Sequence, residues 1–67
     1  MTLLHFNDTF GPRFELRADD GRVVVLTAGD THLQPVRDWL KWIRIPQVTI
    51  DRLVAQARSQ TGTPVEF

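Results

Sequence analysis

A chain of 67 residues is long enough to build one hydrophobic core and too short to build two, so we expect a single domain spanning residues 1–67. Hydrophobic residues make up 42% of the sequence and charged residues 24%, which is typical of globular proteins and argues against a disordered or fibrous chain. Eight basic and eight acidic residues give a formal net charge of zero. This balance excludes a strongly basic nucleic-acid coat and an acidic mimic of a phosphate backbone.

The sequence contains no cysteine, which excludes disulfides, thiolate metal sites and cysteine nucleophiles. Residues 1–8 have neither the basic segment nor the long apolar segment of a signal peptide. The longest apolar run, Val23–Leu26, is far too short to span a membrane. We therefore expect a cytoplasmic protein that does not enter a membrane.

The first half of the chain has the pattern of β-strands. Residues 13–19 alternate strictly between polar and apolar side chains, which is typical of a strand with one buried face. Asp20-Gly21 then separates this segment from a second strand over residues 22–27, and an Asp-Gly pair favours a two-residue type I′ hairpin turn. A further strand is expected over residues 3–6, followed by a turn over residues 7–12.

A two-residue turn at Asp20-Gly21 fixes which side chains of the hairpin share a face. It pairs Ala18 with Val23, Leu16 with Val25, and Phe14 with Thr27. We expect these residues, together with Leu4 and Phe6, to form the buried face of the sheet. The opposite face would then carry the remaining residues of the three strands: Leu3, His5, Arg13, Glu15, Arg17, Val24 and Leu26.

The second half of the chain has the pattern of two amphipathic helices. Between Pro35 and Arg44 the apolar residues fall at helical spacing, and the helix is expected to begin between Thr31 and Pro35 and to end before Pro46. A second helix is expected over residues 49–60. Its apolar positions are Ile50, Leu53, Val54 and Ala57.

The ends of the second helix have recognisable signals. Thr49 is a candidate N-cap, Asp51 would complement the helix dipole in the first turn, and Gly62 suits a left-handed C-cap. The tail over residues 63–67 is compatible with an edge strand or with a packed end. Together these elements predict an α+β fold in which a three-stranded antiparallel meander precedes two α-helices packed on one of its faces (β-β-β-α-α).

Nothing in the sequence assembles a catalytic or metal site. His5 and His32 are the only histidines, and neither has a partner at metal-ligand spacing, so we expect both to lie at the surface or in a loop. The carboxylate pair Asp19-Asp20 is explained by the preference of turns for aspartate. We therefore expect no enzymatic activity, no cofactor and no bound metal.

The charges are unevenly distributed along the chain. Residues 1–30 carry five acids and three bases, whereas residues 31–60 carry two acids and five bases. The five bases are candidates for a nucleic-acid interface: Arg37, Lys41, Arg44, Arg52 and Arg58. Asp38 dilutes this group, and a solvated helix surface explains the same residues.

Several apolar residues are expected at the surface. Trp39 belongs to the apolar stripe of the first helix, whereas Trp42 falls outside it, where it would either form a binding site or pack under residues 45–46 or under the tail. Leu3, Val24 and Leu26 would lie on the outer face of the sheet, which is polar in most open antiparallel sheets.

These features favour a small non-enzymatic protein-interaction or regulatory module. Its candidate binding residues are Trp42, Leu3, Val24 and Leu26, and the partner would be another protein or a second copy in a weak homodimer. The alternative is a nucleic-acid-binding regulator that uses the five basic residues of the helices.

Overall fold

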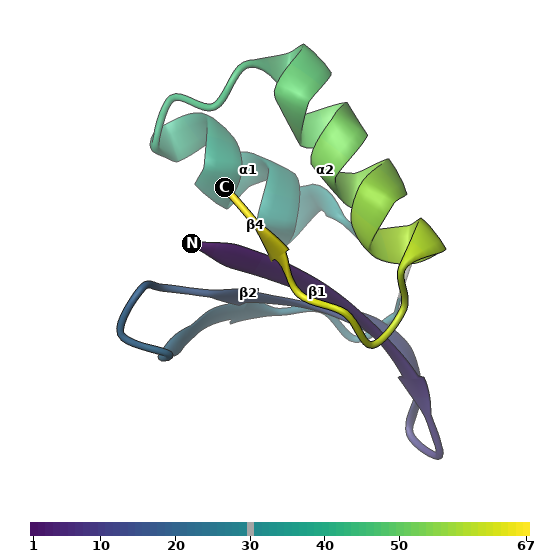
Figure 1. Ribbon diagram of the computed structural model, residues 1–67. Coiled ribbons are helices and arrows are strands. Elements are labelled where there is room, and N and C mark those ends of the chain that lie inside the picture. The colour runs from purple at the N-terminus through teal and green to yellow at the C-terminus, as the bar shows by residue number, and fades with distance from the viewer. Residues whose placement is uncertain (30) are drawn as a thin grey trace.

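The computed structural model describes residues 1–29 and 31–67 and contains a four-stranded antiparallel sheet with two helices on one of its faces (Figure 1). The elements are β1 (Thr2–Asp8), β2 (Gly11–Arg17), β3 (Val23–Leu26), α1 (Gln34–Trp42), α2 (Gln47–Ser59) and β4 (Val65–Glu66). The strands lie in the order β3-β2-β1-β4. The predicted α+β class and the β-β-β-α-α layout are confirmed, and β4 adds a fourth strand to the expected three.

The pairing of β1 with β2 decides which residues of β1 face the helices. Leu3 pairs with Leu16 and His5 pairs with Phe14, so these four side chains lie on the helix-facing side. Leu3, Leu16 and Phe14 are fully buried there. The prediction that Leu3 and His5 point outward is therefore wrong, and so is the prediction that Leu4 and Phe6 join the core face.

His5 faces inward because distant residues provide it with partners. Its Nδ1 lies 2.6 Å from Thr61 Oγ1, and its ring stands 4.8 Å from the ring of Phe14. The backbone N–H of Gly62 donates to the His5 carbonyl oxygen at 2.8 Å. The hydrogen bond at Nδ1 and the contact with the Phe14 ring offset part of the cost of burying the imidazole.

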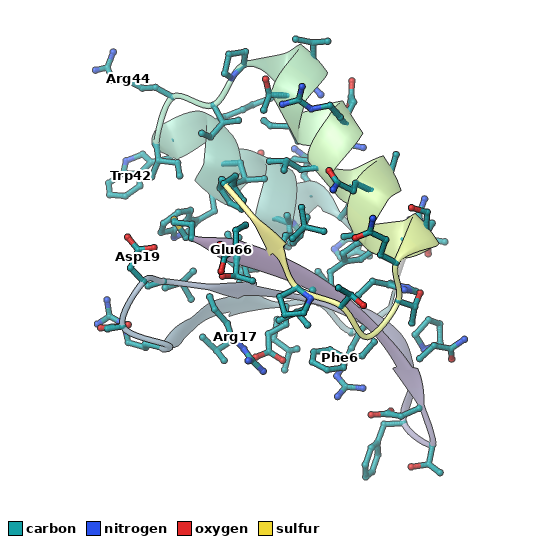
Figure 2. All side chains as sticks on the ribbon, in the orientation of Figure 1. Phe6, Arg17, Asp19, Trp42, Arg44 and Glu66 are labelled. Carbon is teal, nitrogen blue, oxygen red and sulfur yellow. The ribbon has the colours of Figure 1, made fainter. Side chains whose placement is uncertain are left out.

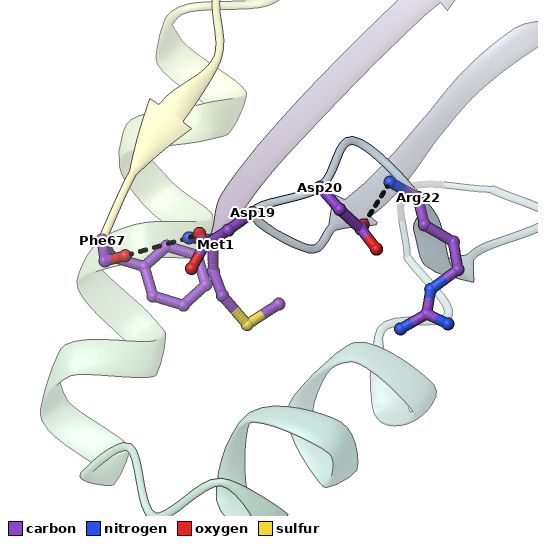
Figure 3. Close-up of polar contacts among 5 residues, drawn as sticks. All are labelled: Met1, Asp19, Asp20, Arg22 and Phe67. Atoms are coloured by element: carbon purple, nitrogen blue, oxygen red, sulfur yellow. Dashed lines mark hydrogen bonds and ion pairs between the residues drawn. The ribbon is translucent and has the colours of Figure 1, made fainter.

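The hairpin between β2 and β3 has a three-residue loop. The Gly21 N–H donates to the Ala18 carbonyl oxygen (3.0 Å), and the Ala18 N–H donates to the Arg22 carbonyl oxygen (2.8 Å). Gly21 has a φ of 86°, whereas Asp20 has a negative φ and its Oδ1 accepts the Arg22 N–H at 2.9 Å (Figure 3). This is a type I turn followed by a left-handed glycine, so the predicted two-residue type I′ turn is wrong.

A second irregularity restores part of the predicted register. Arg17 pairs with Val23 and Leu16 pairs with Val25, so Val24 is the extra residue of a β-bulge. The predicted pairing of Leu16 with Val25 is confirmed, whereas Ala18 does not pair with Val23. Val24 packs against the core and Val23 is exposed on the outer face, which reverses their predicted positions.

Helix α1 begins at Gln34, within the predicted interval, and Pro35 occupies its first turn. It ends in a Schellman motif: the Ile45 N–H donates to the Leu40 carbonyl oxygen (3.0 Å), and the Arg44 N–H donates to the Lys41 carbonyl oxygen (2.9 Å). Arg44 occupies the left-handed position of this motif, with a φ of 71°.

Helix α2 begins two residues before the predicted start. Pro46 is its N-cap residue, and the Pro46 carbonyl oxygen accepts the Ile50 N–H at 3.0 Å. Thr49 is therefore inside the helix and is not its N-cap, and Asp51 lies beyond the first turn. The predicted buried face of α2, which includes Ile50, is confirmed.

The tail after α2 forms an edge strand. The Thr63 N–H donates to the Gln60 carbonyl oxygen (2.8 Å), and Gly62 has a φ of 85° inside this turn. The left-handed conformation expected for Gly62 is thus present, one residue further from the helix than expected. Val65 then pairs with Leu3 and is buried, which fixes β4 beside β1.

The core lies between the helix layer and the inner face of the sheet. Leu33, Val36 and Leu40 come from α1 and the loop before it, and they pack with residues of α2 and of β1, β2 and β4. Trp39 is partly buried against this cluster, in agreement with its predicted place in the apolar stripe. With both helices on the inner side, no helix or strand formed by residues 1–29 and 31–67 covers the other face of the sheet (Figure 1).

Candidate functional site

The main candidate site is the face of the sheet that points away from both helices, which we call the open face. Pairing across β1, β2 and β3 arranges its side chains in rows that run across the strands. One row contains Leu4, Glu15 and Leu26, and the next contains Thr2, Arg17 and Val23. The open face comprises Leu4, Phe6, Arg13, Glu15, Arg17, Val23 and Leu26. It therefore combines apolar side chains with two arginines and one glutamate. Leu4 and Glu15 are buried, whereas Val23 and Leu26 are exposed.

An aromatic–arginine stack forms one corner of the open face. The guanidinium carbon of Arg13 lies 4.7 Å from the centre of the Phe6 ring, within the range of a cation–π contact. Arg13 Nη1 also donates to Asp8 Oδ1 at 2.9 Å. This hydrogen bond, followed by one from the Phe10 N–H, holds the pKa of Asp8 below its usual value. The charge of Arg13 is thus neutralised within the chain.

A second ion pair lies in the middle of the open face. Arg17 Nε donates to Glu15 Oε1 at 2.5 Å, and the Glu15 side chain is only 10% exposed. The neighbours of Glu15 across the strands are Leu4 and Leu26. The Glu15 carboxylate is therefore paired with Arg17 and flanked by two leucines. A protein that covered this region would not bury an unpaired acidic side chain.

One end of the open face is hollowed. A depression of about 500 Å³ is lined by Met1, Thr2, Leu4, Arg17, Ala18, Asp19, Gly21, Pro64, Glu66 and Phe67. Arg17 and Glu66 are labelled in Figure 2, and Figure 3 shows the amino group of Met1 paired with Asp19 and hydrogen-bonded to the Phe67 carbonyl oxygen. The volume of this depression is typical of pockets that accept a ligand or the side chains of a partner.

The four predicted protein-binding residues do not form one surface. Leu26 is 58% exposed on the open face, as expected, whereas Leu3 is fully buried and Val24 packs against the core. Trp42 is 77% exposed, so the alternative that it packs under residues 45–46 or under the tail is wrong. It belongs to α1 rather than to the sheet, and its ring meets that of Trp39 edge-on at 6.0 Å.

Three apolar residues of the open face were not predicted to lie there. Leu4, Phe6 and Val23 were assigned to the core because β1 and the start of β3 were given the wrong side-chain alternation. The adjacent leucines Leu3 and Leu4 were the available signal, because any alternation must place one of them on each face.

The predicted basic residues of the helices are partly neutralised. Arg37 Nη1 donates to Asp51 Oδ1 at 2.6 Å across the two helices. This hydrogen bond and a second one from Gln47 hold the pKa of Asp51 below its usual value, with a smaller contribution from the charge of Lys41. Two of the five predicted bases therefore lie close to a carboxylate.

The remaining basic residues are dispersed over the helix layer. The Arg58 guanidinium lies 5.4 Å from the ring centre of Phe14, which belongs to β2. Arg44 follows the last turn of α1, and Arg52 lies in the middle of α2. The five predicted bases therefore come from both helices and from the segment between them.

The candidate catalytic residues lie apart. His5 is buried between the sheet and the turn after α2, so the predicted surface position is wrong for this histidine, whereas His32 is exposed ahead of α1. Asp19 and Asp20 belong to the β2–β3 turn, as predicted. Among residues 1–29 and 31–67, no group of three metal-ligating side chains is placed to hold an ion. In the same part of the chain, no helix has the length and hydropathy to cross a membrane.

Comparison with known proteins found no matching family model, no matching curated protein and no matching solved structure. The geometry of the chain itself is therefore the basis for any functional proposal.

Proposed function

We propose that this protein is a small non-enzymatic interaction module that regulates by binding, and that its open face contacts a partner protein or a second copy of the chain. The observation that carries the proposal is the absence of a covering layer over Val23 and Leu26. Val23 is 46% exposed and Leu26 58% exposed, and they lie in neighbouring cross-strand rows. Contiguous apolar surface of this kind marks interaction sites on small proteins.

The polar groups of the open face support a protein partner over a nucleic acid. Arg13 is paired with Asp8 and Arg17 with Glu15, so each arginine already has a carboxylate within hydrogen-bonding distance. Phosphate binding would have to compete with both pairs. A protein surface that buries Leu26 can leave both pairs intact and gain about 25 cal/mol for each Å² of apolar area removed from water.

The hollow beside Leu4 gives the open face a shape that a partner can recognise. It provides a concave region next to the flat rows of the sheet, and shape complementarity at a buried centre distinguishes specific interfaces from loose contacts. We propose that the side chains of the partner enter this hollow while the sheet rows contact its apolar surface. A cytoplasmic location remains a prediction.

The test compares Leu26→Lys with Val48→Lys. Both residues are exposed and apolar, but Val48 lies on α2, and neither substitution disturbs a core residue. Self-association is measured by light scattering over a range of concentrations. Partner binding is measured by quantitative cross-linking in a native lysate treated with nuclease.

We expect Leu26→Lys to abolish the dimer or the cross-linked partner, because a charge would be buried in the contact, and Val48→Lys to retain it. If the unmutated protein and Leu26→Lys give the same masses by light scattering and the same cross-linked products, the open face is refuted as the binding site. Loss of all captured material on nuclease treatment would favour the nucleic-acid alternative instead.

A further inference from the structure

A second surface lies at the end of α1, at a distance along the fold from the open face. It consists of Lys41, Trp42 and Arg44, and we call it the α1 corner. All three side chains are exposed. Figure 2 shows Trp42 and Arg44 on the same side of the molecule, with Trp42 between Arg44 and Asp19 in that view. The α1 corner therefore exposes an aromatic ring and a guanidinium group on one side of the molecule.

Trp42 makes little use of its ring within the domain. It is 77% exposed, and its ring contact is the edge-on approach to Trp39 at 6.0 Å. That contact covers one edge of the ring and leaves most of its surface in water. Tryptophan is enriched among the residues that contribute much of the binding energy at interfaces.

Arg44 occupies a backbone position that suits glycine. Its φ of 71° lies in the left-handed region, which side chains with a Cβ adopt at a cost. Its N–H completes the Schellman motif, and glycine would do the same without strain. Among the ion pairs of the described residues, none involves Arg44 or Lys41, although the charge of Lys41 contributes slightly to the lowered pKa of Asp51. The α1 corner thus carries two cations outside these ion pairs, and Arg44 is the one with a guanidinium group.

We propose that the α1 corner binds an acidic peptide segment of a partner protein, with a carboxylate on Arg44 and a neighbouring apolar side chain on Trp42. The guanidinium fork matches a carboxylate in a bidentate contact, and the adjacent indole offers the apolar surface that such a peptide needs. This site is separate from the open face, so the chain would join two protein surfaces.

The local charges favour a short acidic peptide over a polyanion. Asp38 precedes Lys41 by one helical turn, and Asp51 lies near Lys41 on the facing helix. These acids weaken the positive potential around Lys41, so the α1 corner suits one carboxylate on Arg44 better than the successive phosphates of a nucleic acid or the headgroups of an anionic membrane. Both of those ligands require several cations in a continuous array, and the α1 corner offers two, Lys41 and Arg44.

The experiment begins with selection of a random peptide library on the immobilised full chain. Enriched peptides are then labelled and titrated by fluorescence anisotropy against the unmutated protein and against Arg44→Gly, Trp42→Ala and Arg22→Ala. Arg22 is the matched control, because it is an exposed arginine in the β2–β3 hairpin. Oligothymidine and phosphatidylserine vesicles are titrated in parallel.

We expect the enriched peptides to contain Asp or Glu beside a large apolar residue. Arg44→Gly should weaken binding about tenfold or more, since a hydrogen bond to a charged group contributes on that scale. Trp42→Ala should weaken it by a similar factor, because it removes the aromatic surface that the apolar side chain of the peptide contacts. Arg22→Ala should bind like the unmutated protein. Arg44→Gly removes backbone strain, so a loss of binding cannot be attributed to unfolding.

Three results would overturn the inference: enriched peptides without acidic residues, affinity that is unaffected by Arg44→Gly, or binding of oligothymidine or vesicles through Arg44 with no peptide enriched. Leu26→Lys separates this inference from the proposed function. Peptide binding that depends on Leu26 and not on Arg44 would assign the peptide to the open face, and would refute the α1 corner alone.

Discussion

Replacing Arg44 tests whether the strain at the end of α1 is real. The informative comparison is Arg44→Gly against Arg44→Ala, because both variants lose the same charge and differ in their tolerance of the left-handed backbone. A left-handed residue with a Cβ costs about 1–2 kcal/mol, whereas glycine loses roughly 0.5–1 kcal/mol more conformational freedom on folding. We therefore expect Arg44→Gly to be more stable than Arg44→Ala by about 1 kcal/mol.

A difference of this size is measurable in a small domain. It corresponds to a gap of roughly 4–8 °C between the melting temperatures of the two variants. The same pair of substitutions at Arg52, in the exposed middle of α2, provides a control of opposite sign. There Gly should be less stable than Ala by about 1 kcal/mol, since glycine is a poor helix former.

Thermal unfolding monitored by circular dichroism gives both differences, and urea titration gives the free energy of unfolding independently. If Arg44→Ala is as stable as Arg44→Gly, the left-handed conformation of this residue is refuted. The Schellman motif would then be refuted as well, together with the outward position of the Arg44 side chain. If glycine stabilises both positions, the measured effect does not come from the helix end.

Three further predictions follow from the fold. Leu3→Ala should lower the free energy of unfolding, measured in urea, by about 2–5 kcal/mol, because Leu3 is fully buried. Leu26→Ala should change it little, and equally small effects of the two substitutions would indicate that Leu3 points outward. Gly21→Val should lower the free energy of unfolding by about 1–2 kcal/mol, because a β-branched residue resists a φ of 86°, and an unchanged melting temperature would contradict the turn described here. The pKa of Asp51 is lowered from 3.8 in the folded protein, so its contribution to stability is complete above that value and is lost as the pH falls through the lowered pKa. Asp51→Asn should therefore melt below the unmutated protein at neutral pH and approach it in acid, and a gap that does not change with pH would count against the pair with Arg37.

Local patterns predicted the elements that depend on neighbouring residues. The alternation around Phe14 and Leu16 placed both side chains in the core, and the helical spacing of Val36 and Leu40 identified the buried face of α1. The pairing of Leu16 with Val25 was also predicted correctly, although the three-residue loop and the bulge at Val24 each shift the register by one residue and cancel.

The open face could not be predicted because its composition depends on contacts between distant segments. The sequence Leu3-Leu4-His5-Phe6 allows either alternation, and a histidine is expected to face water. The structure buries His5 because Thr61, more than fifty residues away, provides its hydrogen bond. The run of three valines in β3 is equally ambiguous until the bulge assigns Val23 to the outer face.

The two outermost strands limit how this domain can assemble. β3 has four residues and carries the bulge at Val24, and β4 has two residues. Short and irregular edges are poor templates for adding strands from other molecules, which is the route to fibrils. Contact through a face can instead close after one partner has bound, as in a two-fold dimer. The edges of this sheet therefore offer little backbone to which a strand of another molecule could be added.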